Sequence, residues 1–249
     1  MKSPMHYGAL LAALMLVASC KSQLQPTVSK EQYYQIDSTL QADTGIVNYY
    51  SPYKAKLESE MNRVIGYSDV ALQKDNGEES LAGNFFADAL LWKGKQLDPD
   101  VQASFGTKGG IRSGLKAGNI TVGNIFEMMP FENAVTVLTL GGEDMLRWAA
   151  FMAKTGGQPV SGVRLDIRDG QVENFLVQGK PVDPKATYKL VTYDYLANGG
   201  DYVTCFDNVL ARKDHAQRIR ETLMEYVSDL TKNGKHIQGK IDGRVRIVK

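Results

Sequence analysis

The chain has 249 residues, of which 43% are hydrophobic and 23% charged, and it contains 24 glycines. This composition is typical of a folded globular protein and excludes an intrinsically disordered chain, a collagen and a coiled coil. Because 29 Lys and Arg residues stand against 28 Asp and Glu residues, the chain has no excess positive charge with which to bind nucleic acid. Two cysteines and three histidines are too few for a disulfide framework or a zinc cage.

The N-terminus has the pattern of a bacterial lipoprotein signal. Lys2 lies near the start, and the apolar run 7–17 is followed by Ala and Ser directly before Cys20. The run is too short to span a membrane. We expect residues 1–19 to be a signal peptide and Cys20 to be lipidated, which makes the mature protein an exported, membrane-anchored lipoprotein of the cell envelope. An ordinary secretory signal with an incidental cysteine is the alternative.

A polar linker and then one folded domain are expected after this signal. Residues 20–50 are rich in Gln, Ser and Thr, as linkers are, and the domain is expected over 51–249. Ser51 and Pro52 predict the start of a helix, as a cap followed by a first helical position. The apolar segment 65–72 predicts a strand.

The middle of the chain predicts a mixture of helices and strands. Ser80 caps a helix that is expected to run to Lys93 and to end at Gly94. Thr121 caps a short helix that runs to Met128. The pair Asp169-Gly170 predicts a tight hairpin. The other expected elements are a helix at 143–153, strands at 101–105, 134–140 and 188–193, and hairpin strands at 162–167 and 171–177.

The last helix has the strongest helical periodicity. Asp214 and Gln217 have the spacing of a capping box, and apolar residues follow at helical intervals as far as Leu230. Gly234 is expected to end the helix, and 244–248 to form the final strand. Helices and hairpins without a regular βαβ alternation predict an α+β fold, with a mixed β-sheet packed with helices.

Four loop segments combine glycines with side chains that bind planar, hydroxylated or anionic groups. They are Thr-Lys-Gly-Gly-Ile-Arg at 107–112, Met-Pro-Phe-Glu-Asn at 129–133, Val-Ser-Gly-Val at 160–163 and Tyr-Leu-Ala-Asn-Gly-Gly-Asp at 195–201. With Glu-Ser-Leu-Ala-Gly-Asn at 79–84 and Asp-Gly-Arg at 242–244, this ordered set resembles the C-terminal domain of the 5′-nucleotidase family, which includes ecto-5′-nucleotidases and bacterial UDP-sugar hydrolases. The resemblance covers residues 54–249 and implies a fold like that domain.

The resemblance also implies a role for individual residues. In this family the C-terminal domain binds the base and sugar of a nucleotide, while a separate N-terminal domain holds two metal ions and hydrolyses the phosphate ester. Phe131 and Tyr195 match the aromatic residues that stack on the base, and Asp201 matches the carboxylate that accepts hydrogen bonds from the ribose. Arg112 matches the arginine directed at the phosphate. Two further residues match positions that line the base pocket, Asn133 and Gly162.

At two positions the chain departs from the family pattern. Thr107 replaces an asparagine, and residues 76–77 are Asn-Gly where many relatives carry an arginine. Thr107 can still form one hydrogen bond, and Lys108 or Lys74 could supply a replacement charge, although neither lysine has the fork of a guanidinium. Both changes fall in the expected nucleotide pocket, so the base and phosphate preferences stay open.

The sequence has neither the Asp-x-His nor the Gly-Asn-His motifs of a two-metal phosphatase, and it has no GxSxG motif, P-loop or Rossmann fingerprint. We therefore expect no catalytic residue, metal site or cofactor in this chain, and divalent metals only in a partner catalytic domain. The leading interpretation is the nucleotide-recognition half of a split 5′-nucleotidase or UDP-sugar hydrolase that acts with a separate metallophosphatase subunit. The alternatives are a non-catalytic surface lipoprotein that binds nucleotides or nucleosides, and a structural lipoprotein with a decayed pocket.

Overall fold

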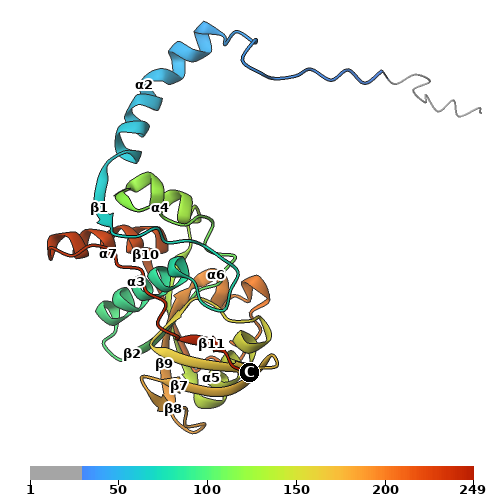
Figure 1. Ribbon diagram of the computed structural model, residues 1–249, viewed down its shortest axis with the longest axis vertical. Coiled ribbons are helices and arrows are strands. Elements are labelled where there is room, and N and C mark those ends of the chain that lie inside the picture. Colours follow the sequence, from blue (N-terminus) through green and yellow to red (C-terminus); the bar gives the residue numbers. More distant parts are fainter. Residues whose placement is uncertain (1–29) are drawn as a thin grey trace, which may run out of the picture. The chain divides into compact units, whose positions relative to one another are not determined.

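The computed structural model describes residues 30–249 (Figure 1). The predicted signal peptide and Cys20 lie outside the described residues. The chain divides into two compact units, with the boundary between Tyr49 and Tyr50. The described part of the first unit, 30–49, contains a turn at 37–40 and the start of a helix.

That helix, α2 (Thr44–Met61), begins earlier than the predicted start at Ser51. The Asp43 carboxylate accepts a hydrogen bond from the Ile46 N–H at 3.0 Å, so Asp43 caps the helix and Pro52 lies inside it. α2 has no buried residues. Neither α2 nor any other helix within the described residues is both long and apolar enough to cross a membrane.

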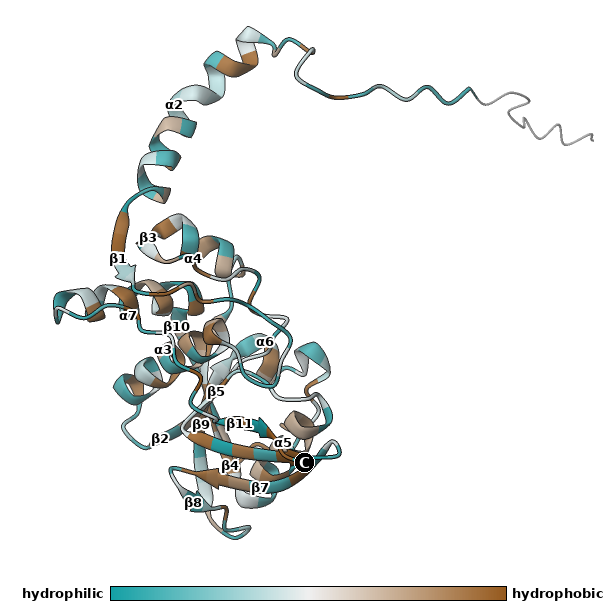
Figure 2. Ribbon diagram, viewed as in Figure 1, coloured by the Kyte–Doolittle hydropathy of each residue, from teal (hydrophilic) through white to brown (hydrophobic). Residues whose placement is uncertain are grey.

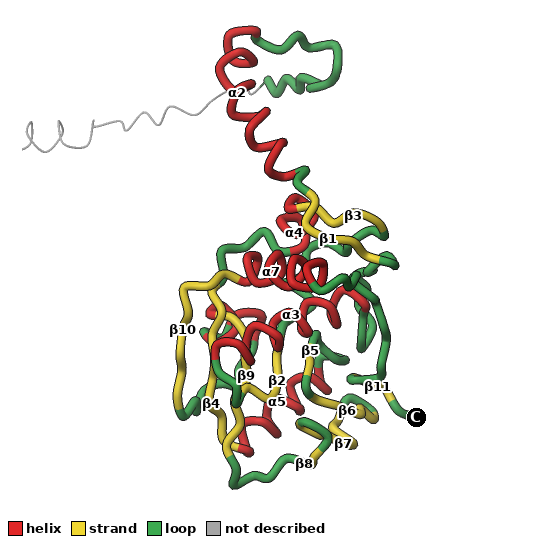
Figure 3. The backbone as a smooth tube through the Cα atoms, turned by 90° about the vertical axis from the view of Figure 1, so that its left-hand side faces the viewer, coloured by secondary structure: helices red, strands yellow, loops and turns green. Residues whose placement is uncertain are grey.

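A five-stranded sheet forms the centre of the second unit (Figure 3). Its strands, in spatial order, are β10 (Ala211–Arg218), β4 (Ala134–Gly141), β9 (Thr187–Tyr193), β2 (Val101–Phe105) and β5 (Val160–Ser161). β2 and β9 are parallel, and the other neighbours are antiparallel. The predicted strands at 101–105, 134–140 and 188–193 and the mixed sheet are confirmed. Because β2 and β9 are parallel, the loops that follow them leave the same edge of the sheet.

A four-stranded sheet and a two-stranded sheet complete the β-structure. The first contains β11 (Val245–Ile247), β6 (Val163–Arg168), β7 (Gln171–Val177) and β8 (Lys180–Pro181), and the second contains β1 (Val64–Ser68) and β3 (Gly118–Thr121). The predicted hairpin between β6 and β7 is confirmed. Asp169 and Gly170 both have left-handed backbone angles, with φ values of 51° and 73°, as a two-residue hairpin turn of this kind requires.

Helices pack against the strands of the second unit. They are α3 (Leu81–Leu97), α4 (Val122–Met128), α5 (Gly142–Lys154), α6 (Asp194–Ala197), α7 (Ile219–Lys232) and the 3-10 turn η1 (Gly200–Tyr202). α5 packs against strands of both larger sheets. Its fully buried Trp148 lies between Phe105 of β2 and Phe175 of β7, with ring centroids 5.6 and 5.8 Å away. In Figure 2, apolar residues lie along the strands around α5. The burial of these residues against α5 stabilises the packing of the two larger sheets.

The predicted start of α3 is confirmed, but its predicted end is wrong. Ser80 accepts a hydrogen bond from the Gly83 N–H at 3.1 Å and caps the helix. α3 then continues through Gly94 to Leu97. A Cβ on Gly94 would lie 2.7 Å from a methyl carbon of Val191, so this glycine allows α3 to lie directly against β9.

The predicted start of the last helix is also wrong. Asp214 and Gln217 lie in β10, where Asp214 is opposite Thr136 of β4 and accepts a hydrogen bond from its hydroxyl at 2.7 Å. α7 begins only at Ile219. Pairing with β4 satisfies a whole row of backbone groups, whereas the local capping pattern satisfies one or two.

Candidate functional site

The loops after β2 and β9 meet at one edge of the five-stranded sheet. Thr107 follows β2, and Tyr193 is the last residue of β9. Tyr195 lies in α6, and Asp201 lies in η1. The parallel pairing of β2 with β9 brings these four residues together, and we call them the Asp201 cluster.

Both carboxylate oxygens of Asp201 accept hydrogen bonds from hydroxyl groups. Thr107 Oγ1 donates to Oδ2, and the Tyr195 hydroxyl, 3.2 Å away, donates to Oδ1. The Tyr195 oxygen also accepts a hydrogen bond from the Asp201 backbone N–H at 3.2 Å. The carboxylate is therefore held at both ends, while each oxygen keeps a second acceptor position.

A buried tyrosine supports this arrangement from below. The Tyr193 side chain is 1% exposed, and its hydroxyl is 3.2 Å from Thr107 Oγ1. Burial raises the pKa of Tyr193 well above its ordinary value, so its proton is retained. Because Thr107 gives its hydrogen to Asp201, Tyr193 is the donor to Thr107. A Cβ on Gly110 would lie 2.3 Å from the Tyr193 oxygen, which explains the need for glycine there.

Phe131 and Arg112 adjoin the cluster. The guanidinium carbon of Arg112 lies 5.9 Å from the centre of the Phe131 ring, and Arg112 Nη1 donates to the Gly109 carbonyl oxygen at 3.2 Å. Gly109 in turn approaches Asp201 so closely that a Cβ on it would lie 3.0 Å from Oδ2. Phe131 is 41% exposed and Tyr195 47% exposed, so both residues present apolar surface to solvent.

Asn133 connects the loop that carries Phe131 to the segment that carries Tyr195. Its side-chain amide donates to Asp194 Oδ1 at 3.0 Å, and the same oxygen accepts the Tyr195 backbone N–H at 2.7 Å. Asn133 therefore links the Phe131 loop to the residue before Tyr195. The structure brings together the predicted residues Arg112, Phe131, Asn133, Tyr195 and Asp201.

Gly162 lies in a different environment from the other predicted residues. It connects β5 to β6 with a φ of 78°. A Cβ on Gly162 would lie 2.1 Å from the Gln102 carbonyl oxygen and 2.8 Å from the Gln178 side-chain nitrogen. The left-handed backbone and the close approach to β2 account for a glycine at this position.

Two arginines that sequence reasoning missed hold the aromatic loops. Arg220 is 7% exposed, forms an ion pair with Glu132 and donates to the Phe131 carbonyl oxygen at 3.4 Å. Arg212 donates to Asn198 Oδ1 at 2.7 Å and so fixes the loop between Tyr195 and Asp201. Arg220 is 88 residues from Glu132 and Arg212 is 14 residues from Asn198, and no local motif marks either arginine.

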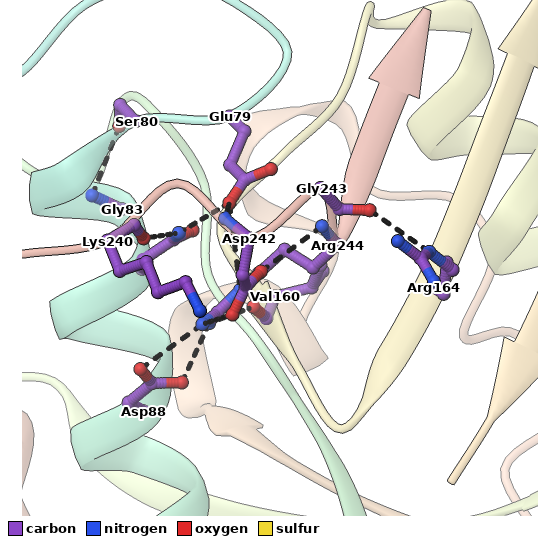
Figure 4. A network of polar contacts seen from close by, with 11 residues as sticks. Glu79, Ser80, Gly83, Asp88, Val160, Arg164, Lys240, Asp242, Gly243 and Arg244 are labelled. Carbon is purple, nitrogen blue, oxygen red and sulfur yellow. Dashed lines mark hydrogen bonds and ion pairs between the residues drawn. The ribbon is translucent and has the colours of Figure 1, made fainter. Parts of the chain in front are cut away.

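The segments 79–84 and 242–244 meet in a separate polar network (Figure 4). The Arg244 guanidinium donates to Asp88 Oδ1 at 2.7 Å and to Asp242 Oδ2 at 2.8 Å. The Asp242 N–H donates to Glu79 Oε1 at 2.9 Å. The hydrogen bond from Arg244 lowers the pKa of Asp242. This network attaches the C-terminal segment to α3.

A cavity of about 580 Å³ borders the Arg244 network. Its acidic side chains are already paired: Asp88 and Asp242 with Arg244, and Asp69 with His236 at 2.8 Å. The Asp201 cluster, by contrast, combines half-exposed rings with open acceptor positions. We therefore place the candidate ligand site at the Asp201 cluster.

Both positions that depart from the family pattern form hydrogen bonds within the fold. Thr107 bonds Asp201 as described above. The main-chain oxygen of Asn76 accepts a hydrogen bond from Lys108 Nζ at 3.2 Å, and the Gly156 oxygen accepts another at 3.1 Å. Burial lowers the pKa of Lys108. Two of the three ammonium donors of Lys108 are thus used by main-chain carbonyls.

Within residues 30–249, no group of three or more His, Cys, Asp or Glu side chains could hold a metal ion. A two-metal phosphatase centre requires such a group. The metal centre that the resemblance implies for the family therefore does not fit the described residues.

The chain is similar in sequence to known proteins. Residues 55–208 match the family described as 5′-nucleotidase, C-terminal domain. The chain is 26% identical to the trifunctional nucleotide phosphoesterase protein YfkN of Bacillus subtilis (strain 168), over 98% of this chain and 18% of YfkN. It is also 26% identical to protein UshA of Escherichia coli (strain K12), over 66% of this chain and 30% of UshA.

A solved structure shows the same fold. The crystal structure of a 5′-nucleotidase precursor from Thermus thermophilus matches with a TM-score of 0.70 and 26% identity, over 82% of this chain and 42% of that chain. This chain spans less than half the length of each of these relatives.

Proposed function

The chain belongs to the 5′-nucleotidase C-terminal domain family, and from this premise we propose that it is the nucleotide-recognition half of a split 5′-nucleotidase or UDP-sugar hydrolase. In this proposal it binds the base and ribose, and a separate two-metal phosphatase subunit hydrolyses the phosphate ester. The observation that carries the proposal is the Asp201 cluster with Phe131 and Arg112 beside it.

The chemistry of the cluster suits the three parts of a nucleotide. Half-exposed aromatic rings at Phe131 and Tyr195 can stack on a base, which contributes roughly 1–3 kcal/mol per ring and tolerates different bases. The Asp201 carboxylate has acceptor positions for sugar hydroxyls. Arg112, at the rim beside Phe131, can bind phosphate oxygens in a bidentate manner.

The resemblance assigns the metal ions of the family to a different domain. The matched segment 55–208 is the C-terminal domain, and the described residues do not fit a metal centre. We therefore place the divalent metals, and the attack on the phosphate, on a partner subunit. The same proposal makes the chain an exported lipoprotein anchored through Cys20, because its first 20 residues have the pattern of a lipoprotein signal.

A non-catalytic nucleotide- or nucleoside-binding lipoprotein is the second candidate. The departures at Thr107 and Asn76 favour it, since the chain lacks there the asparagine and the arginine of the family pattern. Neighbouring genes distinguish the candidates: an adjacent exported metallophosphatase domain without its own C-terminal half favours the split enzyme.

Calorimetric titration of the purified chain with AMP, UDP-glucose and adenosine tests nucleotide recognition. We expect saturable binding of AMP that Phe131→Ala weakens. Absence of binding to all three compounds would contradict both candidates.

Turnover separates the two candidates. The purified chain with Mn²⁺ is expected to leave AMP intact, and addition of the neighbouring metallophosphatase domain is expected to yield phosphate. Metal-dependent turnover by the chain alone would show that the proposed division of labour is wrong. Failure of the mixture to exceed the activity of the phosphatase domain alone would favour the non-catalytic binding protein.

A further inference from the structure

We propose that the hydroxyl groups of Tyr195 and Thr107 are positioning groups that orient the Asp201 carboxylate for a ligand with two vicinal hydroxyls, and so set the preference for ribose. This inference rests on the proposed nucleotide-binding function. It concerns the two hydroxyls, which the expected roles of base stacking by Tyr195 and ribose binding by Asp201 do not require.

The two protein donors leave one open acceptor position on each oxygen of the Asp201 carboxylate. Tyr195 donates to Oδ1 and Thr107 donates to Oδ2, so each oxygen of Asp201 has one protein donor. A carboxylate oxygen has two acceptor positions. One position therefore remains on each oxygen, and the two hydroxyls of a ribose can donate one hydrogen bond to each. If the Asp201 carboxylate could rotate freely, the orientation that offers one open acceptor position on each oxygen to the ribose would be only one of several.

Tyr195 also couples the stacking surface to the carboxylate. A Cβ on Gly200 would lie 2.4 Å from Tyr195 Cε1, so the ring lies directly on the Gly200 backbone. The Tyr195 oxygen accepts the Asp201 N–H, and Asp201 has a left-handed φ of 52°, an unfavourable conformation for a residue with a side chain. The hydroxyl thus helps hold a strained backbone in the geometry that faces the ligand.

Thr107 is fixed by partners on both sides. Its Oγ1 lies 3.2 Å from the Tyr193 hydroxyl, accepts the Gly110 N–H at 3.3 Å and donates to Asp201. Because a carboxylate oxygen can only accept, the hydrogen on Thr107 points toward Asp201, and the Tyr193 hydroxyl donates to Thr107. Thr107 therefore maintains one orientation of the carboxylate.

The hydroxyls can be removed without removing the ring or the side-chain volume. Tyr195→Phe keeps the stacking surface, and Thr107→Val keeps the shape of the threonine. Thr107→Ser keeps the hydroxyl and serves as the conservative rescue. Tyr202→Phe is the matched control, because Tyr202 lies next to Asp201 and is 91% exposed.

The test compares AMP with 2′,3′-dideoxy-AMP by calorimetry on the full chain. The wild type is expected to prefer AMP. In Tyr195→Phe and in Thr107→Val we expect the affinity for AMP to fall roughly 3- to 10-fold, the usual effect of one hydrogen bond, with the affinity for the dideoxy compound unchanged. Thr107→Ser and Tyr202→Phe are expected to retain the wild-type preference.

The outcomes separate this inference from the proposed function. A wild type that binds neither compound overturns both. A wild type that prefers AMP, with the same preference in Tyr195→Phe and Thr107→Val, overturns the positioning role and leaves nucleotide recognition intact. An equal loss of affinity for both compounds in Tyr195→Phe also overturns it, because the hydroxyl then acts on the fold or on stacking. If Thr107→Val fails to fold, the half-exposed Tyr195→Phe decides the matter.

Discussion

The guanidinium carbon of Arg220 lies 4.0 Å from the centre of the Phe126 ring. The same side chain is 9% exposed, pairs with Glu132 and bonds the Phe131 carbonyl oxygen. A helical arginine thus fixes the backbone of the loop that presents the Phe131 ring. A buried, charged side chain thus helps to position Phe131, a candidate ligand-binding residue.

Arg220→Ala is expected to lower the free energy of unfolding by roughly 1–3 kcal/mol, because it removes a desolvated cation–π contact with Phe126 and the hydrogen bond to the Phe131 carbonyl oxygen. Urea denaturation measures this change. Arg218→Ala is the control, since Arg218 also pairs with Glu132 but is 47% exposed, and it should cost about 0–1 kcal/mol. Equal losses in the two variants would contradict the structural role of Arg220.

Phe131→Ala is expected to weaken AMP binding by roughly 1–3 kcal/mol while the fold stays intact, because a base would lose one stacking surface. Calorimetry measures the affinity, and circular dichroism checks the fold. Phe131→Tyr keeps an aromatic ring and should bind nearly as the wild type does. Undiminished affinity in Phe131→Ala would show that the ring does not contact the base.

Gly94→Ala is expected to destabilise the protein by roughly 1–3 kcal/mol, although alanine normally favours a helix over glycine by about 1 kcal/mol. The added Cβ would meet methyl carbons of Val191 at 2.7 Å and Val101 at 3.1 Å. Urea denaturation of Gly94→Ala, beside that of Lys95→Ala at the exposed neighbouring position, measures the cost of closer packing. A gain in stability in Gly94→Ala would refute the close approach of α3 to the sheet.

Asp242→Asn is expected to change how stability depends on pH. The hydrogen bond from Arg244 lowers the pKa of Asp242, so its ionised form stabilises the fold above the unfolded-state pKa of about 3.9. This contribution is lost as the pH falls through the lower folded-state value. The stability difference between wild type and variant should therefore be largest near neutral pH and shrink below about pH 4. Denaturation curves from pH 7 to pH 2 measure it, and a difference that stays constant would contradict this role for Asp242.

Cys20→Ser is expected to release the protein from the membrane fraction of its host, or to leave its signal peptide uncleaved, because the acyl chain is proposed as the anchor. Fractionation and mass spectrometry of the N-terminus make the measurement. Wild-type protein found wholly in the soluble fraction, with an unmodified N-terminus, would rule out lipidation.

Much of the local structure follows from short-range patterns in the sequence. Ser80 and Thr121 begin their helices as predicted, because a hydroxyl two or three residues before free N–H groups satisfies them wherever the helix lies. Asp169 and Gly170 form their hairpin for a similar reason, since few other residue pairs adopt two left-handed conformations in succession. The ordered loop motifs also indicated the family, and with it five residues that the fold does bring together.

The tertiary structure decided the features that depend on distant partners. Asp214 lies in a strand because β4 offers backbone pairing that a local capping pattern cannot match. Gly94 continues a helix because Val191, 97 residues later in the chain, packs against it. Thr107 and Asp201 are 94 residues apart in the chain. Only the parallel pairing of β2 with β9 places the Thr107 hydroxyl beside the Asp201 carboxylate. Short-range sequence patterns record what a residue can do locally, whereas its actual partner depends on which strands pair and which surfaces are buried together.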